Sequence, residues 1–264
     1  MQSLIKTAAW AIVSVAITSS AATPTSRVSA SFPSAPSTAG TVAKTVTAAA
    51  AVAALKPSGP PAIQLGSAST RKPAIAFAGT DSLRDQLKYD TVRWGGKPVQ
   101  TLDDASRVAL AKIAAEKAGL HKVGLSYHDV YGIIEAETSW IPRTGSSKDG
   151  TPNLGLAQFE PRTAQGLGVT DPADPVQAVL GAALYMKEGA QWAMGKLAGL
   201  KLPPAEHAAK LREGVSVYYN LSVKGRNKWD GRNTADLPVE TQRHIRNARA
   251  GASEAAQLSR LLKT

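Results

Sequence analysis

The sequence contains no cysteine among its 264 residues. This absence excludes a disulfide framework, a thiolate metal site and a cysteine nucleophile. Histidine is almost as scarce, and the four histidines form no HExxH or similar ligand pattern, so the sequence predicts no metal site. Aromatic residues make up only 5% of the chain, which argues against a stacking platform for single-stranded nucleic acid.

Acidic residues are missing from the first 80 positions, which hold six of the 31 Lys and Arg residues. The other 25 basic residues accompany all 20 Asp and Glu residues in the rest of the chain. More than half of the net charge of +11 therefore belongs to the acid-free N-terminal arm. Because the remainder has mixed and nearly balanced charge, a nucleic-acid partner is not expected.

Long hydrophobic runs are also missing beyond the N-terminus, so no later segment is expected to span a bilayer. Residues 1–22 combine Lys6 with a modest apolar stretch and small residues. This pattern predicts a cleaved secretory signal peptide, with a retained membrane anchor as the less favoured alternative. The Ala-, Ser-, Thr- and Pro-rich composition that follows predicts a disordered linker over residues 23–95. The folded domain is expected at residues 96–264, in the periplasm or cell envelope.

Helix-start signals recur after residue 100. Asp103, Ser126, Asp174-Pro175, Pro203-Pro204 and Pro238 each precede a run with apolar residues at helical spacing. No segment alternates apolar and polar residues with period two over any length. The sequence therefore predicts a mostly α fold.

Glu137 is the carboxylate that this helical spacing singles out. In the helix expected from Ser126, Glu137 lies seven residues after Val130 and so falls on the apolar stripe, whereas Glu135 points elsewhere and is expected to be solvated. A carboxyl group on an apolar face resists ionisation, which suits a general acid. From the spacing alone, a structural Glu paired with an Arg is the favoured interpretation.

Four short blocks in a fixed order change this interpretation. They run from Glu137 to Pro142, from Gly155 to Ala164, over Tyr219-Asn220, and from Leu237 to Thr241. In this order they resemble the motifs of the soluble lytic transglycosylase (SLT) domain of the lysozyme-like superfamily. Its motifs are a Glu-Ser segment ending in Pro, Gly-Leu-Met-Gln before Pro-x-Thr-Ala, then Tyr-Asn and Pro-x-Glu-Thr. The resemblance covers about residues 105–250 and implies a mostly α, lysozyme-like domain of the goose-type or SLT kind.

The resemblance implies that Glu137 is the single general acid and base of a peptidoglycan lytic transglycosylase, a lyase acting on a polysaccharide. Glu137 would protonate the oxygen of the β-1,4 bond between N-acetylmuramic acid and N-acetylglucosamine. It would then take the proton of the muramyl C6 hydroxyl, which attacks C1 and closes a 1,6-anhydro ring. Because the substrate supplies its own nucleophile, the resemblance implies no metal and no cofactor.

Four further site residues follow from the resemblance. Tyr219 would hydrogen-bond Glu137 and orient it, and Gln158 would line the cleft near the N-acetyl group of the sugar. Thr138 would steady Glu137 or touch the substrate. Trp140 could stack on a sugar or pack in the core, and the sequence leaves both readings open.

The sequence departs from the family pattern at three places. Thr138 stands where the family has Ser and keeps the hydroxyl group. Ala157 stands where the family has Met, which would enlarge that part of the cleft. After Tyr219-Asn220, Gly225 arrives later than the pattern expects, so the geometry of that loop does not follow from the resemblance.

Other functions remain open. A muramidase of the goose-lysozyme kind would use the same Glu with water as nucleophile, and Asp149 or Asp171 could then hold the water. A module that binds glycan without cutting it, within an envelope-spanning assembly, is a second alternative. The expected partners are peptidoglycan glycan strands and an envelope-spanning secretion or conjugation machine, and the expected oligomeric state is a monomer.

Overall fold

The structure is a computed structural model, and it describes residues 77, 79–147 and 149–262. The signal peptide expected at residues 1–22 and most of the linker expected at residues 23–95 lie outside the described residues. The domain start expected at residue 96 falls in the turn of a β-hairpin. Gly95 and Gly96 form this turn with φ values of 56° and 80°.

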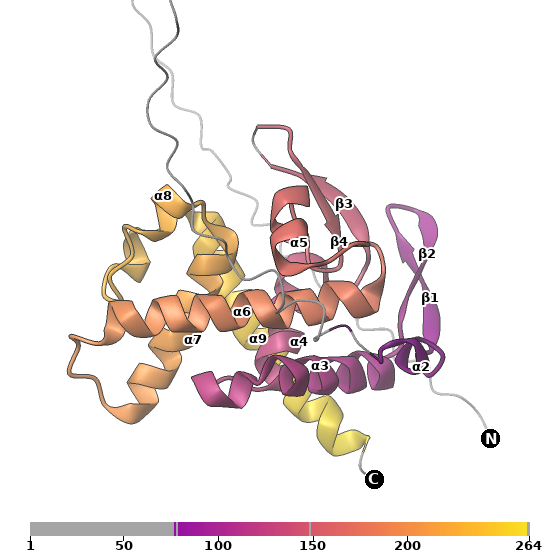
Figure 1. Ribbon diagram of the computed structural model, residues 1–264, viewed down its shortest axis with the longest axis horizontal. Coiled ribbons are helices and arrows are strands. Elements are labelled where there is room, and N and C mark those ends of the chain that lie inside the picture. Colours follow the sequence, from indigo (N-terminus) through magenta and orange to yellow (C-terminus); the bar gives the residue numbers. More distant parts are fainter. Residues whose placement is uncertain (1–76, 78, 148, 263–264) are drawn as a thin grey trace, which may run out of the picture. The chain divides into compact units, whose positions relative to one another are not determined.

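Helices make up most of the described chain (Figure 1). They are α2 (Asp81–Arg84), α3 (Asp104–Ala118), α4 (Tyr127–Thr138), α5 (Pro161–Leu167), α6 (Pro175–Leu197), α7 (Pro204–Asn220), α8 (Val223–Arg226) and α9 (Val239–Leu261), with short 3-10 turns at Leu120–Val123 and Thr234–Asp236. The prediction of a mostly α fold is confirmed.

Two antiparallel hairpins accompany the helices. Strand β1 (Tyr89–Trp94) pairs with β2 (Lys97–Leu102), and β3 (Arg143–Ser146) pairs with β4 (Pro152–Gly155). The chain therefore forms strands although no segment of its sequence alternates apolar and polar residues with period two. Five of the six residues of β1 are exposed, and β3 and β4 have four residues each, so neither hairpin has the apolar alternation of a half-buried strand.

The expected helix starts are confirmed by their caps. The side chain of Asp103 accepts a hydrogen bond of 2.7 Å from the backbone amide of Ser106 at the start of α3. Ser126 and Asp129 form a capping box at the start of α4, and Asp174 caps α6. Helices α7 and α9 begin at the expected prolines, and α9 is one continuous helix from Val239 to Leu261.

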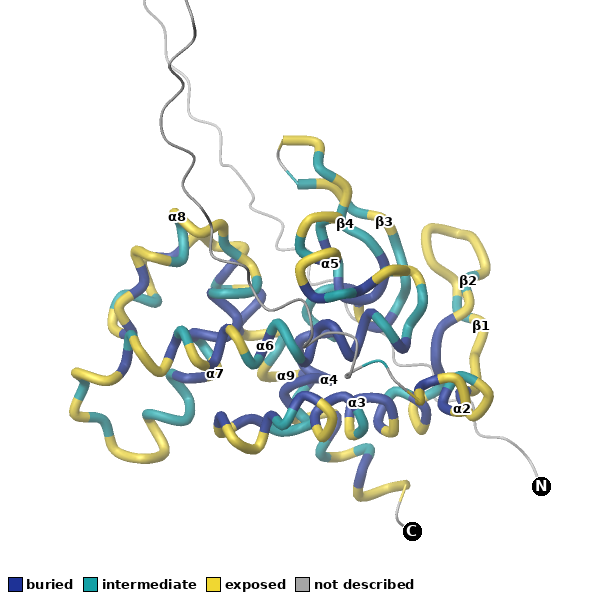
Figure 2. Tube along the Cα trace, viewed as in Figure 1, coloured by how far each residue is buried: buried dark blue, intermediate teal, exposed yellow. Residues whose placement is uncertain are grey.

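Helix α4 lies at the centre of the packing and contacts α3, α6 and α9. Its side chains are buried over most of its length (Figure 2). Val130, Tyr131 and Ile134 have no exposed area. Long helix α6 packs in turn on α7. Both ends of α4 are thus held by neighbouring helices, which fixes the position of any side chain in its last turn.

Helices α4 and α9 run antiparallel in close contact. The hydroxyl of Tyr127 bonds Ser259 at 3.0 Å near one end, and the hydroxyl of Tyr131 donates to Glu254 at 2.9 Å one turn further along α4. At Gly132 the two backbones touch, since a Cβ atom added to Gly132 would overlap the carbonyl oxygen of Ala248 in α9. This close approach brings the first turns of α9 beside the last turn of α4.

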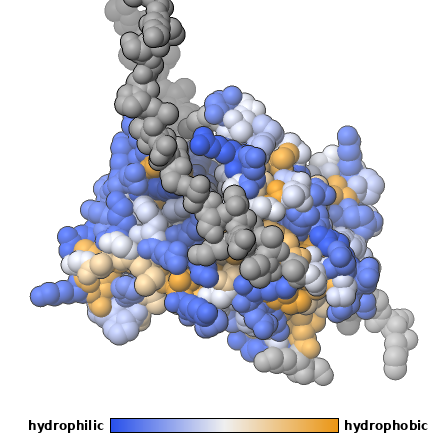
Figure 3. All heavy atoms as spheres, viewed as in Figure 1, coloured by the Kyte–Doolittle hydropathy of each residue, from blue (hydrophilic) through white to orange (hydrophobic). Residues whose placement is uncertain are grey.

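The face shown in Figure 3 is mostly hydrophilic, with hydrophobic residues in small groups. Among the described residues, the large hydrophobic side chains that are exposed are spread along the chain and include Trp94, Met194 and Val223. No helix in the part of the chain that the structure describes is both long and apolar enough to cross a membrane.

Candidate active site

Glu137 lies in the last turn of α4, and its side chain is 15% exposed. It lines a cleft of about 1110 Å³. Its lining residues come from the β3–β4 loop, α5, α6, the end of α7 and α8. Figure 1 shows α5 and the β3–β4 hairpin on one side of α6 and α8 further along it. The carboxyl group therefore lies between core and solvent, at the edge of the apolar stripe on which the helical spacing placed it.

Glu135 lies two residues before Glu137 and does not line this cleft. It packs against α9, where a Cβ atom added to Gly251 would come within 2.7 Å of the Cβ atom of Glu135. Burial raises the pKa of Glu135, and the nearby carboxylate of Glu254 raises it further. Glu135 thus points away from the cleft as expected, but it is half-buried and not fully solvated.

His244 of α9 holds the Glu137 carboxyl group. Its Nε2 atom lies 2.8 Å from Oε1 of Glu137, and the His244 side chain is only 5% exposed. The Nδ1 atom of His244 is buried and has no hydrogen-bond partner among the described residues. A buried N–H without an acceptor is rarer than an unpaired lone pair, so we infer that the hydrogen lies on Nε2. In this tautomer Nε2–H donates to Oε1.

His244 was missed by the sequence interpretation. It faces the core side of α9, three residues after the buried Thr241 and next to the buried Ile245. The sequence signal that could have singled out His244 is a lone histidine on the apolar stripe of an amphipathic helix. That signal does not name a partner, because Glu137 is 107 residues away in the chain.

Tyr219 lies in the cleft but does not hydrogen-bond Glu137 as expected. Its hydroxyl group donates to the carbonyl oxygen of Ala157 at 3.0 Å. Its ring stacks on His244, with 6.2 Å between ring centroids and 20° between the ring planes. Burial, together with the negative charge of Glu137, raises the pKa of Tyr219 well above its ordinary value. Tyr219 thus packs against the His244 ring that holds Glu137. The expected hydrogen bond from Tyr219 to Glu137 is wrong.

Gln158 lies in the cleft at the end of a tight turn. Its backbone has φ of 50°, and its Nε2 atom donates to the carbonyl oxygens of Arg143 at 2.9 Å and Gly155 at 2.8 Å. Gly155 is required in this turn, because its φ is 70° and a Cβ atom would overlap the carbonyl oxygen of Pro172. The motif therefore builds one wall of the cleft, and contact of Gln158 with a sugar stays a prediction.

Thr138 is buried, with 1% of its area exposed, so it does not reach substrate. Its hydroxyl oxygen lies 3.0 Å from the carbonyl oxygen of Leu156 and 3.3 Å from that of Ile134. The side chain therefore ties the last turn of α4 to the turn that carries Gln158. Two roles were expected for Thr138. Contact with the substrate is wrong, because the side chain is buried. The observed hydrogen bonds instead hold the last turn of α4 in place next to Glu137.

Trp140 belongs to the core and not to the cleft. It has no exposed area, and its ring lies 5.0 Å from the ring of Tyr131. The chain reverses direction after α4 because Ser139 and Trp140 adopt φ values of 52° and 60°, which turns the indole inward. The expectation that Trp140 stacks on a sugar is therefore wrong, and the core alternative holds.

Arg143 is a second residue that the sequence interpretation missed. Its Nη2 atom donates to the backbone carbonyl oxygen of Glu137, and its guanidinium lies 5.4 Å from the centre of the exposed Trp94 ring. A cation at the C-terminus of a helix stabilises the unpaired carbonyl groups there. Arg143 therefore fixes the backbone that carries the Glu137 side chain.

Comparison with known proteins relates the segment around Glu137 to one family. Residues 115–209 match the family model of the transglycosylase SLT domain. The resemblance indicated by the motifs is confirmed over that segment, which contains Glu137 and Gln158 and ends before Tyr219 and His244.

A curated relative and the solved structures were also compared. A protein of Enterobacteria phage PRD1 named "Transglycosylase" is 42% identical over 59 residues, which is 22% of this chain. The match spans only 21%, about a fifth, of the length of that relative. No solved structure matches.

The cleft holds three carboxyl groups besides Glu137. Asp149 is exposed, and a hydrogen bond from the backbone amide of Thr151 lowers its pKa. Glu160 accepts a bond of 2.8 Å from Ser147, and burial raises the pKa of Glu188. Asp171 does not line the cleft. Among residues 79–147 and 149–262, no group of three or more His, Asp or Glu side chains could hold a metal ion.

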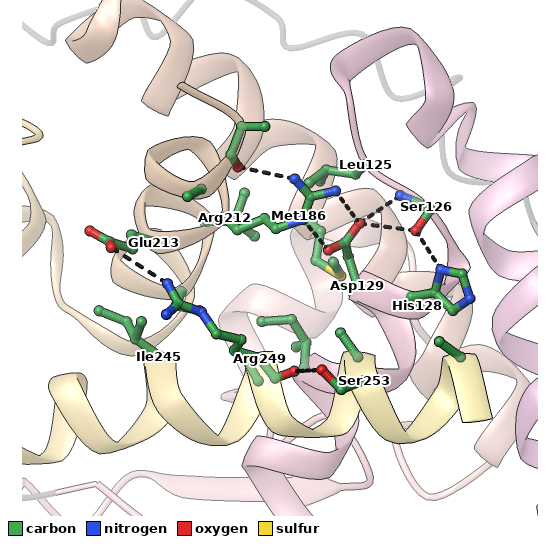
Figure 4. Close-up of a pocket in the computed structure, with 18 of the residues that line it drawn as sticks. Leu125, Ser126, His128, Asp129, Met186, Arg212, Glu213, Ile245, Arg249 and Ser253 are labelled. Carbon is green, nitrogen blue, oxygen red and sulfur yellow. Dashed lines mark hydrogen bonds and ion pairs between the residues drawn. The ribbon is translucent and has the colours of Figure 1, made fainter. Parts of the chain in front are cut away.

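A second pocket of about 550 Å³ lies between α4, α7 and α9 (Figure 4). Arg212 crosses it to bind Asp129 at 2.7 Å, and Arg249 reaches Glu213 at 3.8 Å. Alanine side chains of α7 and α9 line much of the rest, and none of the predicted site residues is among them. We therefore place the candidate active site in the cleft with Glu137, and the Arg212–Asp129 pair fixes the start of α4.

Proposed function

We propose that this protein is a peptidoglycan lytic transglycosylase that cuts the β-1,4 bond between N-acetylmuramic acid and N-acetylglucosamine. The observation that carries the proposal is the placement of Glu137, whose carboxyl group lines a large cleft and is held from the core side by His244. The match of the surrounding segment to the SLT family supports it.

The geometry divides the work between the two oxygens of Glu137. Oε1 accepts the hydrogen bond from His244, and among the described residues no hydrogen bond is made to Oε2. Oε2 can therefore carry the acid proton and give it to the glycosidic oxygen as the bond to C1 breaks. The muramyl C6 hydroxyl then attacks C1 and returns its proton to Oε2. Glu137 ends in its starting form, and the anhydro ring replaces the broken bond.

Hydrolysis with the same general acid is the second candidate. Asp149 favours it, because an exposed carboxylate with a lowered pKa at the cleft could hold an attacking water. The two reactions leave different ends on the muramyl residue. Transglycosylation leaves a 1,6-anhydro ring, and hydrolysis leaves a reducing sugar heavier by one water.

The products of digestion test the proposed reaction. Purified peptidoglycan is incubated with the protein, and the soluble muropeptides are analysed by mass spectrometry. We expect 1,6-anhydro products that do not gain mass from ¹⁸O-labelled water during the reaction. Reducing ends that incorporate the label would contradict the proposal and favour the hydrolase.

Substitution of His244 tests whether it positions Glu137. His244→Phe removes the donor and leaves Oε1 without its partner, which costs roughly 1–3 kcal/mol and corresponds to a fall in kcat of about 5- to 150-fold. His244→Gln can still donate through its amide and is expected to recover part of the rate. Turnover of peptidoglycan is measured with His121→Gln, a change at an exposed histidine, as control. Equal rates for the Phe and Gln variants at equal thermal stability would contradict a positioning role.

The proposed substrate lies outside the cytoplasmic membrane, so the proposal implies that the protein acts in the cell envelope. That location agrees with the signal peptide predicted at residues 1–22. An envelope-spanning secretion or conjugation machine as partner, and a monomeric state, stay predictions.

A further inference from the structure

The chain departs from the family pattern directly after Tyr219-Asn220, and the departure builds one edge of the cleft. Helix α7 ends at Asn220, and Ser222 then caps the short helix α8 by accepting a bond of 3.3 Å from Gly225. The side chain of Arg226, the last residue of α8, lines the cleft that contains Glu137. This extra segment therefore adds a cation to the site.

The guanidinium of Arg226 is held rigidly on one side. Its central carbon lies 3.7 Å from the centre of the Tyr218 ring. Its Nη1 atom lies 3.4 Å from both the hydroxyl oxygen of Tyr185 and the carbonyl oxygen of Tyr218. An arginine fixed by an aromatic face loses little further conformational freedom when it binds a ligand.

The other side of this guanidinium has no partner. Among the described residues, neither Nε nor Nη2 of Arg226 makes a hydrogen bond, and no carboxylate lies within 4.0 Å of the group. The positive charge of Arg226 acts on Glu188, but the Glu188 carboxyl group accepts a hydrogen bond of 3.4 Å from Tyr218, and burial raises its pKa. The edge formed by Nε and Nη2 matches the two oxygens of a carboxylate. A half-buried, fixed cation with this edge free points to an anionic ligand in the cleft.

We propose that Arg226 binds a carboxylate of the peptide stem carried by a muramyl residue, so that the cleft selects strands whose stems are charged. The inference rests on the proposed function, which supplies the glycan strand. The sugars of an intact strand carry no free carboxylate, because the lactyl group is joined to the stem by an amide bond. The stems carry free carboxylates, and they are therefore the part of this substrate that a guanidinium can select.

Two substrates that differ only in charge test the inference. One is purified peptidoglycan, and the other is the same material after its stem carboxylates are converted to primary amides. We expect the wild-type protein to cut the amidated substrate about tenfold more slowly, because a charge-assisted pair is lost. Arg226→Gln should cut native peptidoglycan about tenfold more slowly than wild type and should no longer respond to amidation.

Lys224→Gln is the matched control. Lys224 is an exposed residue of the same short helix, and it does not line the cleft, so the variant loses the same net charge without changing the site. It should keep the wild-type response to amidation. Binding is measured separately by co-sedimentation with insoluble peptidoglycan in the non-cleaving Glu137→Gln background, in which Arg226→Gln should lower retention of the protein.

The possible results separate the inference from the function on which it rests. Equal cleavage of native and amidated peptidoglycan by the wild-type protein would overturn the role of Arg226 and leave the transglycosylase intact. An equal response of the Arg226→Gln and wild-type proteins to amidation would overturn it as well. If the wild-type protein cuts neither substrate, the proposed function fails, and the inference fails with it.

Discussion

Glu137→Gln is expected to lower the cleavage of purified peptidoglycan by about a thousandfold. The amide has the size of the carboxyl group and can still accept the hydrogen bond from Nε2 of His244, so the local structure is kept. It can neither give a proton to the glycosidic oxygen nor take one from the C6 hydroxyl. Loss of general acid–base catalysis typically costs about 10²- to 10⁴-fold.

Glu135→Gln is the matched control for this experiment. Glu135 lies on the same helix, only two residues away, but it packs against Gly251 of α9 and does not line the cleft. Because the Glu135 side chain does not reach the cleft, replacement by an amide should leave the cleavage rate within about twofold of wild type. Release of soluble muropeptides is followed for both variants, with circular dichroism to confirm that both are folded.

The outcome also separates an enzyme from a module that only binds glycan. A binding module would show no release of muropeptides by the wild-type protein and unchanged retention on peptidoglycan in the Glu137→Gln variant. Cleavage by the Glu137→Gln variant at the wild-type rate would show that another group supplies the proton. The cleft offers Glu160 and Glu188 as the next candidates in that case.

The carboxyl group of Glu137 could be placed from the sequence because its position depends on local rules. A capped helix start at Ser126 and a period of 3.6 residues are enough to put Glu137 on the apolar stripe of the helix. The helix starts were predictable for the same reason, since each cap uses residues within three positions of one another.

Contacts between distant parts of the chain could not be placed in this way. His244 meets Glu137 only because α4 and α9 lie antiparallel, and no local pattern shows which helix packs on which. Trp140 is close to Glu137 in sequence, but the left-handed backbone at Ser139 sends it into the core. The partner of the Tyr219 hydroxyl likewise depends on where the turn at Ala157 comes to lie.

The contact between α4 and α9 can be tested at Gly132. We expect Gly132→Ala to lower the free energy of unfolding by about 2–3 kcal/mol. The added methyl group would overlap the carbonyl oxygen of Ala248 and come within 2.9 Å of the amide nitrogen of Ala252, so the backbone of α9 must move. This cost exceeds the gain of about 1 kcal/mol that alanine brings to a helix.

Thermal unfolding measures the effect, with Gly195→Ala as control. Gly195 lies in helix α6, is exposed, and has no atom within 4 Å of an added Cβ, so the same substitution there should raise the stability by about 0.5–1 kcal/mol. The Gly132 variant should instead unfold about 5–10 °C lower than wild type. Because the displaced helix carries His244 away from Glu137, peptidoglycan turnover should also fall in the fraction of the protein that stays folded. A Gly132 variant as stable as the Gly195 variant would contradict the close packing of α4 on α9 that positions the site.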